Sequence, residues 1–262
     1  MSDKLKLISS DYLESYSSAA EIDWKKLAVT LRSKTENTKQ DFEFYAIASS
    51  VFSSKIEGNS LDLNSFMRNR SAKKSSSKKE VEEIENLISA YSFASKKKLT
   101  EKNFLEAHSI LSKTLLKKSE QGKFRKVQVG VYDSFTGKPV YLATEPGEVK
   151  QEISKLFADI NFLIKKKLST KESFYYASMI HLHLAMIHPF ADGNGRAARL
   201  LEKWFLSSAI GEAAWSIASE KFYWDNRPEY YKNISLGFNY YAIHWERCVP
   251  FLLMLLKSLN RG

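Results

Sequence analysis

The chain has 262 residues, carries a formal net charge of +10 and is 44% hydrophobic. This length and apolar content fit one large or two small globular domains and exclude a disordered chain. The single cysteine, Cys248, excludes an internal disulfide and fits a reducing compartment. No signal-peptide pattern opens the sequence, and no apolar run approaches the roughly 20 residues that span a bilayer. We therefore expect a cytoplasmic protein without membrane contact.

Much of the positive charge lies in lysine- and serine-rich segments, for example RNRSAKKSSSKK at residues 68–79. Such a run is typical of a solvated loop, and no RNA- or DNA-binding signature accompanies it. The charge alone therefore does not favour nucleic acid as a ligand.

Most of the chain has apolar residues at helical spacing. The predicted helices cover residues 39–58, 80–95, 101–116, 146–167, 172–188 and 195–210, with further helices in 227–259. The first of them stops at Gly58, a natural helix-ending residue. These helices predict a mainly α protein.

One stretch has strand periodicity instead. Val127, Val129 and Val131 alternate with polar residues, the chain turns at 136–137, and apolar residues recur at 140 and 142. This pattern predicts a β-hairpin over 127–142. A lone hairpin is marginal in water, so its edge is either a structural lid or a strand offered to a partner.

The stretch HPFADGNGR, residues 188–196, gathers several chemically active residue types. Pro189 cannot continue a helix, so His188 is expected at or just past a helix C-terminus. A new helix can begin near Gly195, which makes the intervening residues a tight connection. Gly193 and Gly195 permit positive φ, and backbone N–H groups in such a turn can bind an anion.

The helix that follows adds positive charge to the same place. Its N-terminus presents unpaired N–H groups, and Arg196 and Arg199 lie three residues apart in its first turn. Together they predict a phosphate cradle. Asp192 beside a phosphate calls for a cation, for which Mg²⁺ is the natural choice, and His188 can accept a proton near neutral pH. This combination is typical of nucleotide transfer to a hydroxyl.

The sequence HPFADGNGRAAR, residues 188–199, resembles the active-site signature of the Fic (filamentation induced by cAMP) family, H-P-F-x-[DE]-G-N-G-R-x-x-R, at every fixed position. Members of this family are mostly protein adenylyltransferases, which move AMP from ATP to a target hydroxyl. The resemblance implies that His188 deprotonates a Ser, Thr or Tyr and that Asp192 holds Mg²⁺. It also implies a role in phosphate binding for Gly193, Asn194, Gly195, Arg196 and Arg199.

Three further segments resemble this family. SSKIEGNSL resembles the inhibitory motif [ST]-x-x-x-E-[GN], with Ser53, Glu57 and Gly58 in the fixed places, and implies that Glu57 pairs with Arg199 and restrains the enzyme. GKFRKVQVGV resembles the segment that leads into the target-docking hairpin, or flap. NRPEYY resembles a C-terminal segment whose second tyrosine, here Tyr231, flanks the adenine pocket.

The resemblance implies a Fic-type helical bundle with one small β-hairpin beside the active site. Residues 1–80 would form an N-terminal helical region with the inhibitory helix at about 40–58 and the lysine- and serine-rich loop, and residues 81–262 the catalytic core. The implied function is a self-inhibited adenylyltransferase that uses ATP and Mg²⁺ and docks a protein target on the hairpin. Removal of AMP, transfer of another nucleotide, a non-catalytic interaction module and a homo-oligomer stay open.

Overall fold

The computed structural model describes residues 5–33, 38–71, 78–132 and 139–261. Its helices are α1 (Leu13–Ala19), α2 (Trp24–Ser33), α3 (Thr38–Ile56), α4 (Leu63–Ser71), α5 (Lys78–Lys96), α6 (Glu101–Leu111), α7 (Val149–Lys165), α8 (Thr170–Ile187), α9 (Asn194–Ile210), α10 (Ser219–Asp225), α11 (Arg227–Ile234) and α12 (Val249–Lys257). Two short strands, β1 (Gly130–Tyr132) and β2 (Pro139–Leu142), complete the fold. The turn predicted at 136–137 lies outside the described residues.

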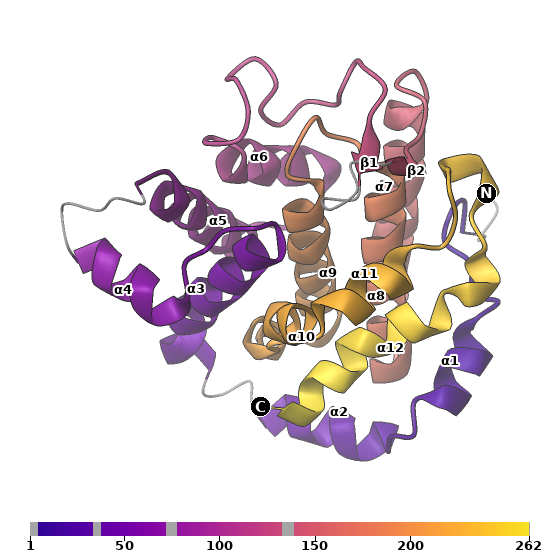
Figure 1. Cartoon of the computed structure of the whole chain (residues 1–262). Helices are drawn as coiled ribbons and strands as arrows, with labels where there is room; N and C mark the ends of the chain where they lie inside the picture. The colour runs from indigo at the N-terminus through magenta and orange to yellow at the C-terminus, as the bar shows by residue number, and fades with distance from the viewer. Residues whose placement is uncertain (1–4, 34–37, 72–77, 133–138, 262) are drawn as a thin grey trace.

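Helices α8 and α9 form the centre of the molecule and pack closely against each other (Figure 1). Nearly every residue of α8 from Ser173 to Ile187 is buried, as is α9 from Arg196 to Leu206. Helix α8 is mainly apolar on all sides and α9 buries both apolar and charged side chains, so both helices need the surrounding helices as partners. The segment between them is therefore held at a rigid corner.

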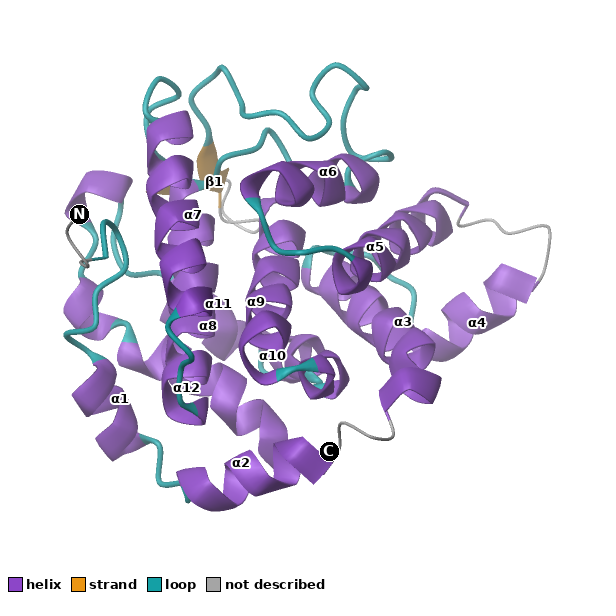
Figure 2. Ribbon diagram, turned by 180° about the vertical axis from the view of Figure 1, so that it is seen from behind, coloured by secondary structure: helices purple, strands orange, loops and turns teal. Residues whose placement is uncertain are grey.

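The other helices cover this central pair from several directions. Helices α3 and α5 pack against each other and against α9, and α7 packs against both α8 and α9. Figure 2 shows α3, α4 and α5 on one side of α9 and α7 on the other. Helix α10 lies against α3 and α12. The corner between α8 and α9 is thus within reach of α3, α5 and α6.

The N-terminal segment is fixed to the bundle by a single carboxylate. The backbone N–H groups of Lys6, Leu7 and Ile8 donate to the carboxylate oxygens of Asp159 on α7 over 2.7, 2.7 and 2.8 Å. Hydrogen bonds to a charged acceptor are stronger than neutral ones. Tyr16 then joins the main hydrophobic core, so these first residues cap the bundle.

The predicted hairpin is present but shorter than its sequence pattern. Strands β1 and β2 pair antiparallel, with Gly130 opposite Leu142 and a bulge after Val131. The backbone N–H of Leu142 donates to the carbonyl of Phe238 over 2.8 Å, so part of the outer edge of β2 is already occupied. A two-stranded sheet needs such support because it is marginal alone.

The prediction of a solvated loop over residues 68–79 is wrong at both ends, which belong to α4 and α5. Arg70 lies between helices, where its guanidinium pairs with Glu85 on α5 at 2.9 Å and with Glu43 on α3 at 3.8 Å. The interhelical charge pairs favour helical structure there. Residues 72–77 lie outside the described part of the chain.

The main hydrophobic core draws on residues from Ile8 to Leu256, on both sides of the boundary expected at residue 80. That division of the chain stays a prediction. None of the described helices is both long enough and apolar enough to cross a membrane.

Candidate active site

The loop between α8 and α9 carries the signature and is closed by one asparagine. Helix α8 ends at Ile187, and His188 follows as its C-cap with a left-handed φ of 53°. The side-chain amide of Asn194 donates to the carbonyl of Phe190 and accepts from its N–H, both at 2.9 Å. Its side chain is therefore used within the loop, and only its backbone N–H faces the anion site that the sequence predicts.

The backbone conformation of His188 is costly and is defined by its surroundings. A left-handed conformation costs a residue other than glycine about 1–2 kcal/mol. Nδ1 of His188 lies 3.2 Å from the carbonyl oxygen of Ala185. Because a carbonyl can only accept, Nδ1 carries the hydrogen and Nε2 keeps its lone pair. The ring thus presents Nε2 as a base.

The electrostatic surroundings keep His188 uncharged at neutral pH. Burial lowers its pKa and the positive charge of Arg125 lowers it further, against the opposing effects of the Ala185 carbonyl, Glu57 and Asp192. A neutral imidazole is the form that can accept a proton.

Asp192 lies at the exposed rim of the loop, directly before the N-terminus of α9. Its Oδ1 accepts the N–H of Gly193 over 2.5 Å, and Oδ2 takes no part in this hydrogen bond. The described residues contain no cluster of three or more histidine, cysteine or acidic side chains that could hold a metal. One carboxylate fits Mg²⁺, because this ion keeps several waters and completes its shell with substrate phosphates.

His108 on α6 binds the backbone of Asp192 and not its carboxylate. Its Nδ1 accepts the N–H of Gly122 over 3.1 Å, so Nε2 carries the hydrogen and donates to the carbonyl of Asp192 over 3.0 Å. The ring also stacks on Phe190 at a centroid distance of 3.5 Å. Burial lowers the pKa of His108 to about 4, so it stays neutral. No local sequence pattern links α6 to the loop, so this contact could not be predicted from the sequence.

The two glycines of the loop have different functions. Gly193 has a φ of 82° and precedes the first turn of α9, where no side chain caps the helix. Gly195 is helical and does not use a positive φ, contrary to the expectation for it. Instead it permits a close approach, since a Cβ at Gly195 would overlap with Oε1 of Glu57. A carboxylate therefore lies against the turn where the sequence predicts a phosphate.

Glu57 holds this position through Arg199. Nη2 of Arg199 donates to Oε1 of Glu57 over 2.6 Å, and its Nε donates to the hydroxyl of Ser53 over 2.8 Å. Gly58 follows with a φ of 101° and ends the helical turn. The structure thus shows the pairing of Glu57 with Arg199 that the family resemblance implies, and adds a contact of Arg199 with Ser53. Burial would raise the pKa of Glu57, but Arg199 and Arg196 outweigh it and lower that pKa.

A buried polar chain continues from Arg199 into the core. Arg199 Nη1 donates to the hydroxyl of Tyr230 over 3.2 Å, and this hydroxyl donates to Nε2 of His181 over 3.1 Å. Nδ1 of His181 in turn donates to Glu202 over 2.8 Å. Each buried member has partners, which stabilises one arrangement of the guanidinium.

Arg196 is paired with a different carboxylate. Its Nε and Nη2 donate to Oε1 of Glu83 on α5 over 3.1 and 2.6 Å. The first turn of α5 also holds the segment after Gly58, since Glu80 accepts the N–H of Ser60 over 2.8 Å and the side-chain amide of Asn59 over 3.2 Å. Both arginines of the signature are thus engaged by acidic side chains.

A family model described as the Fic/DOC family matches residues 98–206, which include the whole signature. This part of the chain is similar to the Fic/DOC family. The match begins before α6, so it also includes His108 and the hairpin.

Curated relatives share a name that agrees with this match. The chain is similar to "Protein adenylyltransferase Fic" of Aedes aegypti, at 28% identity over 197 residues, covering 72% of this chain and 38% of the relative. It is also similar to the protein of the same name from Drosophila erecta, at 31% identity over 162 residues, covering 59% and 30%. The chain therefore spans less than two fifths of either relative's length.

Solved structures agree in fold. A Fic family protein from Desulfovibrio desulfuricans G20 has a TM-score of 0.69 at 20% identity, with 89% of this chain and 71% of that one covered. A Fic domain-containing signaling protein from Bacteroides thetaiotaomicron has a TM-score of 0.66 at 19% identity, with coverages of 89% and 95%. The fold is therefore the mainly helical Fic fold with a small antiparallel sheet.

The hydroxyl of Tyr231 binds the helix that carries Ser53 and not the signature loop. Its side chain is 43% exposed, and its hydroxyl donates to the carbonyl of Ile56 over 3.0 Å at the end of the predicted inhibitory helix. The preceding Tyr230 reaches Arg199 instead. The role of Tyr231 beside adenine stays a prediction.

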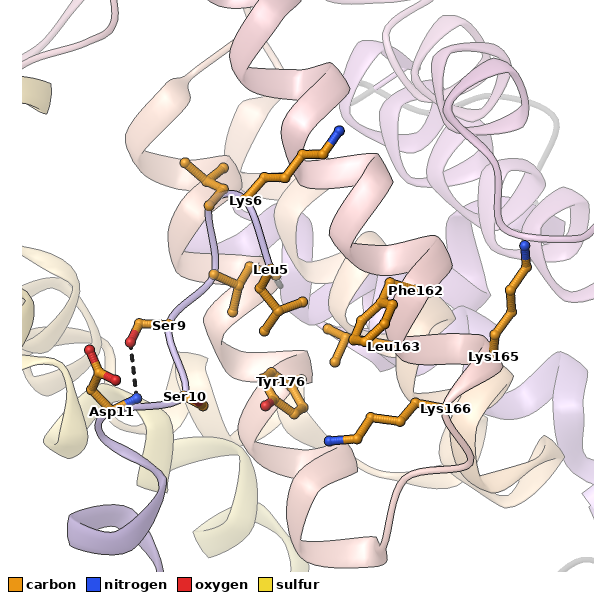
Figure 3. A pocket seen from close by; sticks show the side chains of 12 residues that line it. Leu5, Lys6, Ser9, Ser10, Asp11, Phe162, Leu163, Lys165, Lys166 and Tyr176 are labelled. Carbon is orange, nitrogen blue, oxygen red and sulfur yellow. Dashed lines mark hydrogen bonds between the residues drawn. The ribbon is translucent and has the colours of Figure 1, made fainter. Parts of the chain in front are cut away.

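A pocket of about 800 Å³ lies elsewhere on the Fic fold, between the N-terminal segment and the end of α7. Figure 3 shows Leu5, Phe162, Leu163 and Tyr176 on its walls. No signature residue lines it. This hollow is therefore separate from the loop that carries the signature.

Proposed function

We propose that this chain is a protein adenylyltransferase that transfers AMP from ATP to a hydroxyl of a protein, and that its own Glu57 restrains it. The observation that carries this proposal is the pairing of Arg199 with Glu57 beside an otherwise intact site. The base His188, the carboxylate of Asp192 and the N-terminus of α9 lie around that pair. The relatives named protein adenylyltransferase Fic support the same activity.

The proposed reaction transfers one proton and releases one leaving group. The target hydroxyl oxygen forms a bond to the α-phosphorus of ATP, and the bond from that phosphorus to the α–β bridging oxygen breaks. The hydroxyl proton passes to Nε2 of His188, and pyrophosphate leaves. The N–H groups at the N-terminus of α9 and the guanidinium groups of Arg196 and Arg199 would stabilise the phosphates. Asp192 would hold a Mg²⁺ that neutralises part of the phosphate charge.

Restraint by Glu57 follows from charge. A carboxylate against the first turn of α9 occupies the place of an anion and uses the guanidinium of Arg199. A triphosphate that entered beside it would meet a like charge and lack one cation. Loss of Glu57 would free Arg199 and remove that repulsion.

The hairpin is the proposed site for the protein target. An extended segment could add to a strand edge by main-chain hydrogen bonds. Phe238 already engages Leu142 on the outer edge of β2, so we expect the target to bind nearer Val140, whose side chain is 42% exposed.

The test uses α-labelled ATP with Mg²⁺ on the parent, Glu57→Gly, His188→Ala and the double variant. We expect strong protein labelling in Glu57→Gly, weak labelling in the parent, and none in either variant that lacks His188. Equal labelling of the parent and Glu57→Gly would contradict restraint by Glu57. Absence of label from every variant, with other nucleotides and with added cell lysate as well, would overturn the transferase and favour an interaction module.

A further inference from the structure

Arg125 is a buried arginine that the proposed chemistry does not use. It precedes the hairpin, and only 4% of its surface is exposed. In the described part of the chain, no carboxylate lies within ion-pair distance of it, and its donors go to backbone carbonyls instead. A buried guanidinium needs partners for its N–H donors, so the carbonyls that bind Arg125 hold it in place.

One set of these hydrogen bonds holds the end of α8. Arg125 Nε donates to the carbonyl of His188 over 2.8 Å, and Nη2 lies 3.5 Å from the carbonyl of Ile187. The backbone N–H of Arg125 donates to the carbonyl of Pro189 over 3.0 Å. Three successive carbonyls around the left-handed His188 are therefore bound by one residue.

The second set holds the base of the hairpin. Nη1 donates to the carbonyl of Val127 over 2.9 Å, and Nη2 donates to the carbonyl of Thr144. Val127 lies before β1 and Thr144 lies after β2. One guanidinium thus connects both ends of the hairpin to the backbone of His188.

We propose that Arg125 is a positioning residue that fixes His188 relative to the hairpin. This inference rests on the proposed function, in which the hairpin presents the hydroxyl and His188 accepts its proton. With both attached to the same guanidinium, Nε2 keeps a constant distance from the docked segment. The bond to the His188 carbonyl also holds the left-handed conformation that lets Nδ1 donate to Ala185.

Arginine suits this task better than lysine does. Its planar group has five donors in fixed directions and can bond several carbonyls at once, whereas an ammonium group has three donors on a flexible stem. Lysine should therefore restore only part of the function. The matched control is Arg32, an exposed arginine on α2.

The first measurement does not depend on activity. The chain has five histidines, so ¹⁵N NMR of the imidazole nitrogens can resolve His188, identified by its loss in His188→Ala. We expect the Nδ1–H tautomer in the parent and in Arg32→Gln, and a mixture of tautomers in Arg125→Gln, with Arg125→Lys in between. Circular dichroism checks that each variant is folded. If Arg125→Gln does not fold, the comparison of tautomers rests on Arg125→Lys.

The second measurement repeats these substitutions in the Glu57→Gly background. A misplaced base should lower kcat by about 10²-fold, while KM for ATP stays unchanged because the cradle is intact. Unchanged nitrogen signals in folded Arg125 variants, or an equal kcat, would overturn the proposal. Failure of Glu57→Gly to transfer any nucleotide, with added cell lysate as well, would refute the transferase, and the NMR comparison would still decide whether Arg125 positions His188.

Discussion

Oε1 of Glu57 lies 2.6 Å from Nη2 of Arg199, against the first turn of α9. The Arg199 side chain is almost completely buried, while that of Glu57 keeps 26% of its surface exposed. The guanidinium cannot move to water, whereas the carboxylate is at the rim and can leave. Release of the site therefore requires movement of Glu57 and not of Arg199.

Glu57→Gly should lower the stability of the free protein and increase its response to nucleotide. It leaves the Arg199 guanidinium buried and short of one partner, at a cost of about 2 kcal/mol. We expect ATP with Mg²⁺ to raise Tm more in this variant than in the parent, because bound phosphate replaces the lost carboxylate. Thermal unfolding with and without nucleotide measures both effects, with Glu120→Gln as an exposed control. An equal rise in Tm with nucleotide in the parent and in Glu57→Gly would contradict competition between the Glu57 carboxylate and phosphate for Arg199.

Glu83→Gln should also strengthen nucleotide binding, by a smaller factor. The substitution removes the negative charge that engages Arg196 but keeps a side chain that can hydrogen-bond it. We expect Kd for ATP to fall by about fivefold, because in this mostly buried pair a hydrogen bond to a charged group is worth about 1 kcal/mol more than a neutral one. Kd should fall further when the substitution is combined with Glu57→Gly. Calorimetric titration measures Kd. Weaker binding in Glu83→Gln would show instead that Glu83 orients Arg196 toward phosphate.

Gly195→Ala should be more costly in the parent than in Glu57→Gly. A methyl group at this position overlaps with the Glu57 carboxylate, so the parent must displace it and strain the pair with Arg199. In Glu57→Gly the overlap is gone, and alanine should gain up to about 1 kcal/mol from its higher helix propensity. Chemical unfolding of the four proteins gives the coupling energy. Equal effects in both backgrounds would mean that the two residues do not interact.

His108 should make stability depend on pH in the acid range. Burial lowers the pKa of His108 from its ordinary value of 6.5 to about 4 in the folded protein. Between these values the unfolded chain binds the proton and the folded one does not, so stability is complete above pH 6.5 and falls as pH decreases. From pH 7 to pH 5 the loss due to His108 should be about 2 kcal/mol. Unfolding free energies of the parent and His108→Gln should show a weaker pH dependence in the variant, and parallel curves would contradict this.

The loop at the end of α8 could be predicted because its signals are local. Pro189 ends a long apolar pattern, and the structure places His188 at the C-cap of α8. The contact of Glu57 with Arg199 was predicted through a family resemblance, since 142 residues separate them. The sequence alone contains no periodicity that relates such distant positions.

The supporting residues could not be predicted in the same way. Glu83 and Arg196 are 113 residues apart, and their pairing depends on how α5 packs against α9. His108 and Arg125 act through backbone groups, which every residue possesses, so no residue type marks their partners. Gly195 was expected to use a positive φ, but it is helical and instead permits the approach of Glu57, which is a tertiary contact that no local pattern predicts.

Helix α5 contributes Glu80 to the segment after Gly58 and Glu83 to Arg196. The two residues are almost one turn apart and lie near the N-terminus of the same helix. A shift of α5 by one or two ångströms would weaken both contacts together. It would thereby weaken the ion pairs of Arg196 and Arg199, which follow each other along α9. The arginines would then be released in concert, so that occupancy by nucleotide would respond to the displacement of one helix as a switch does, rather than in two separate steps.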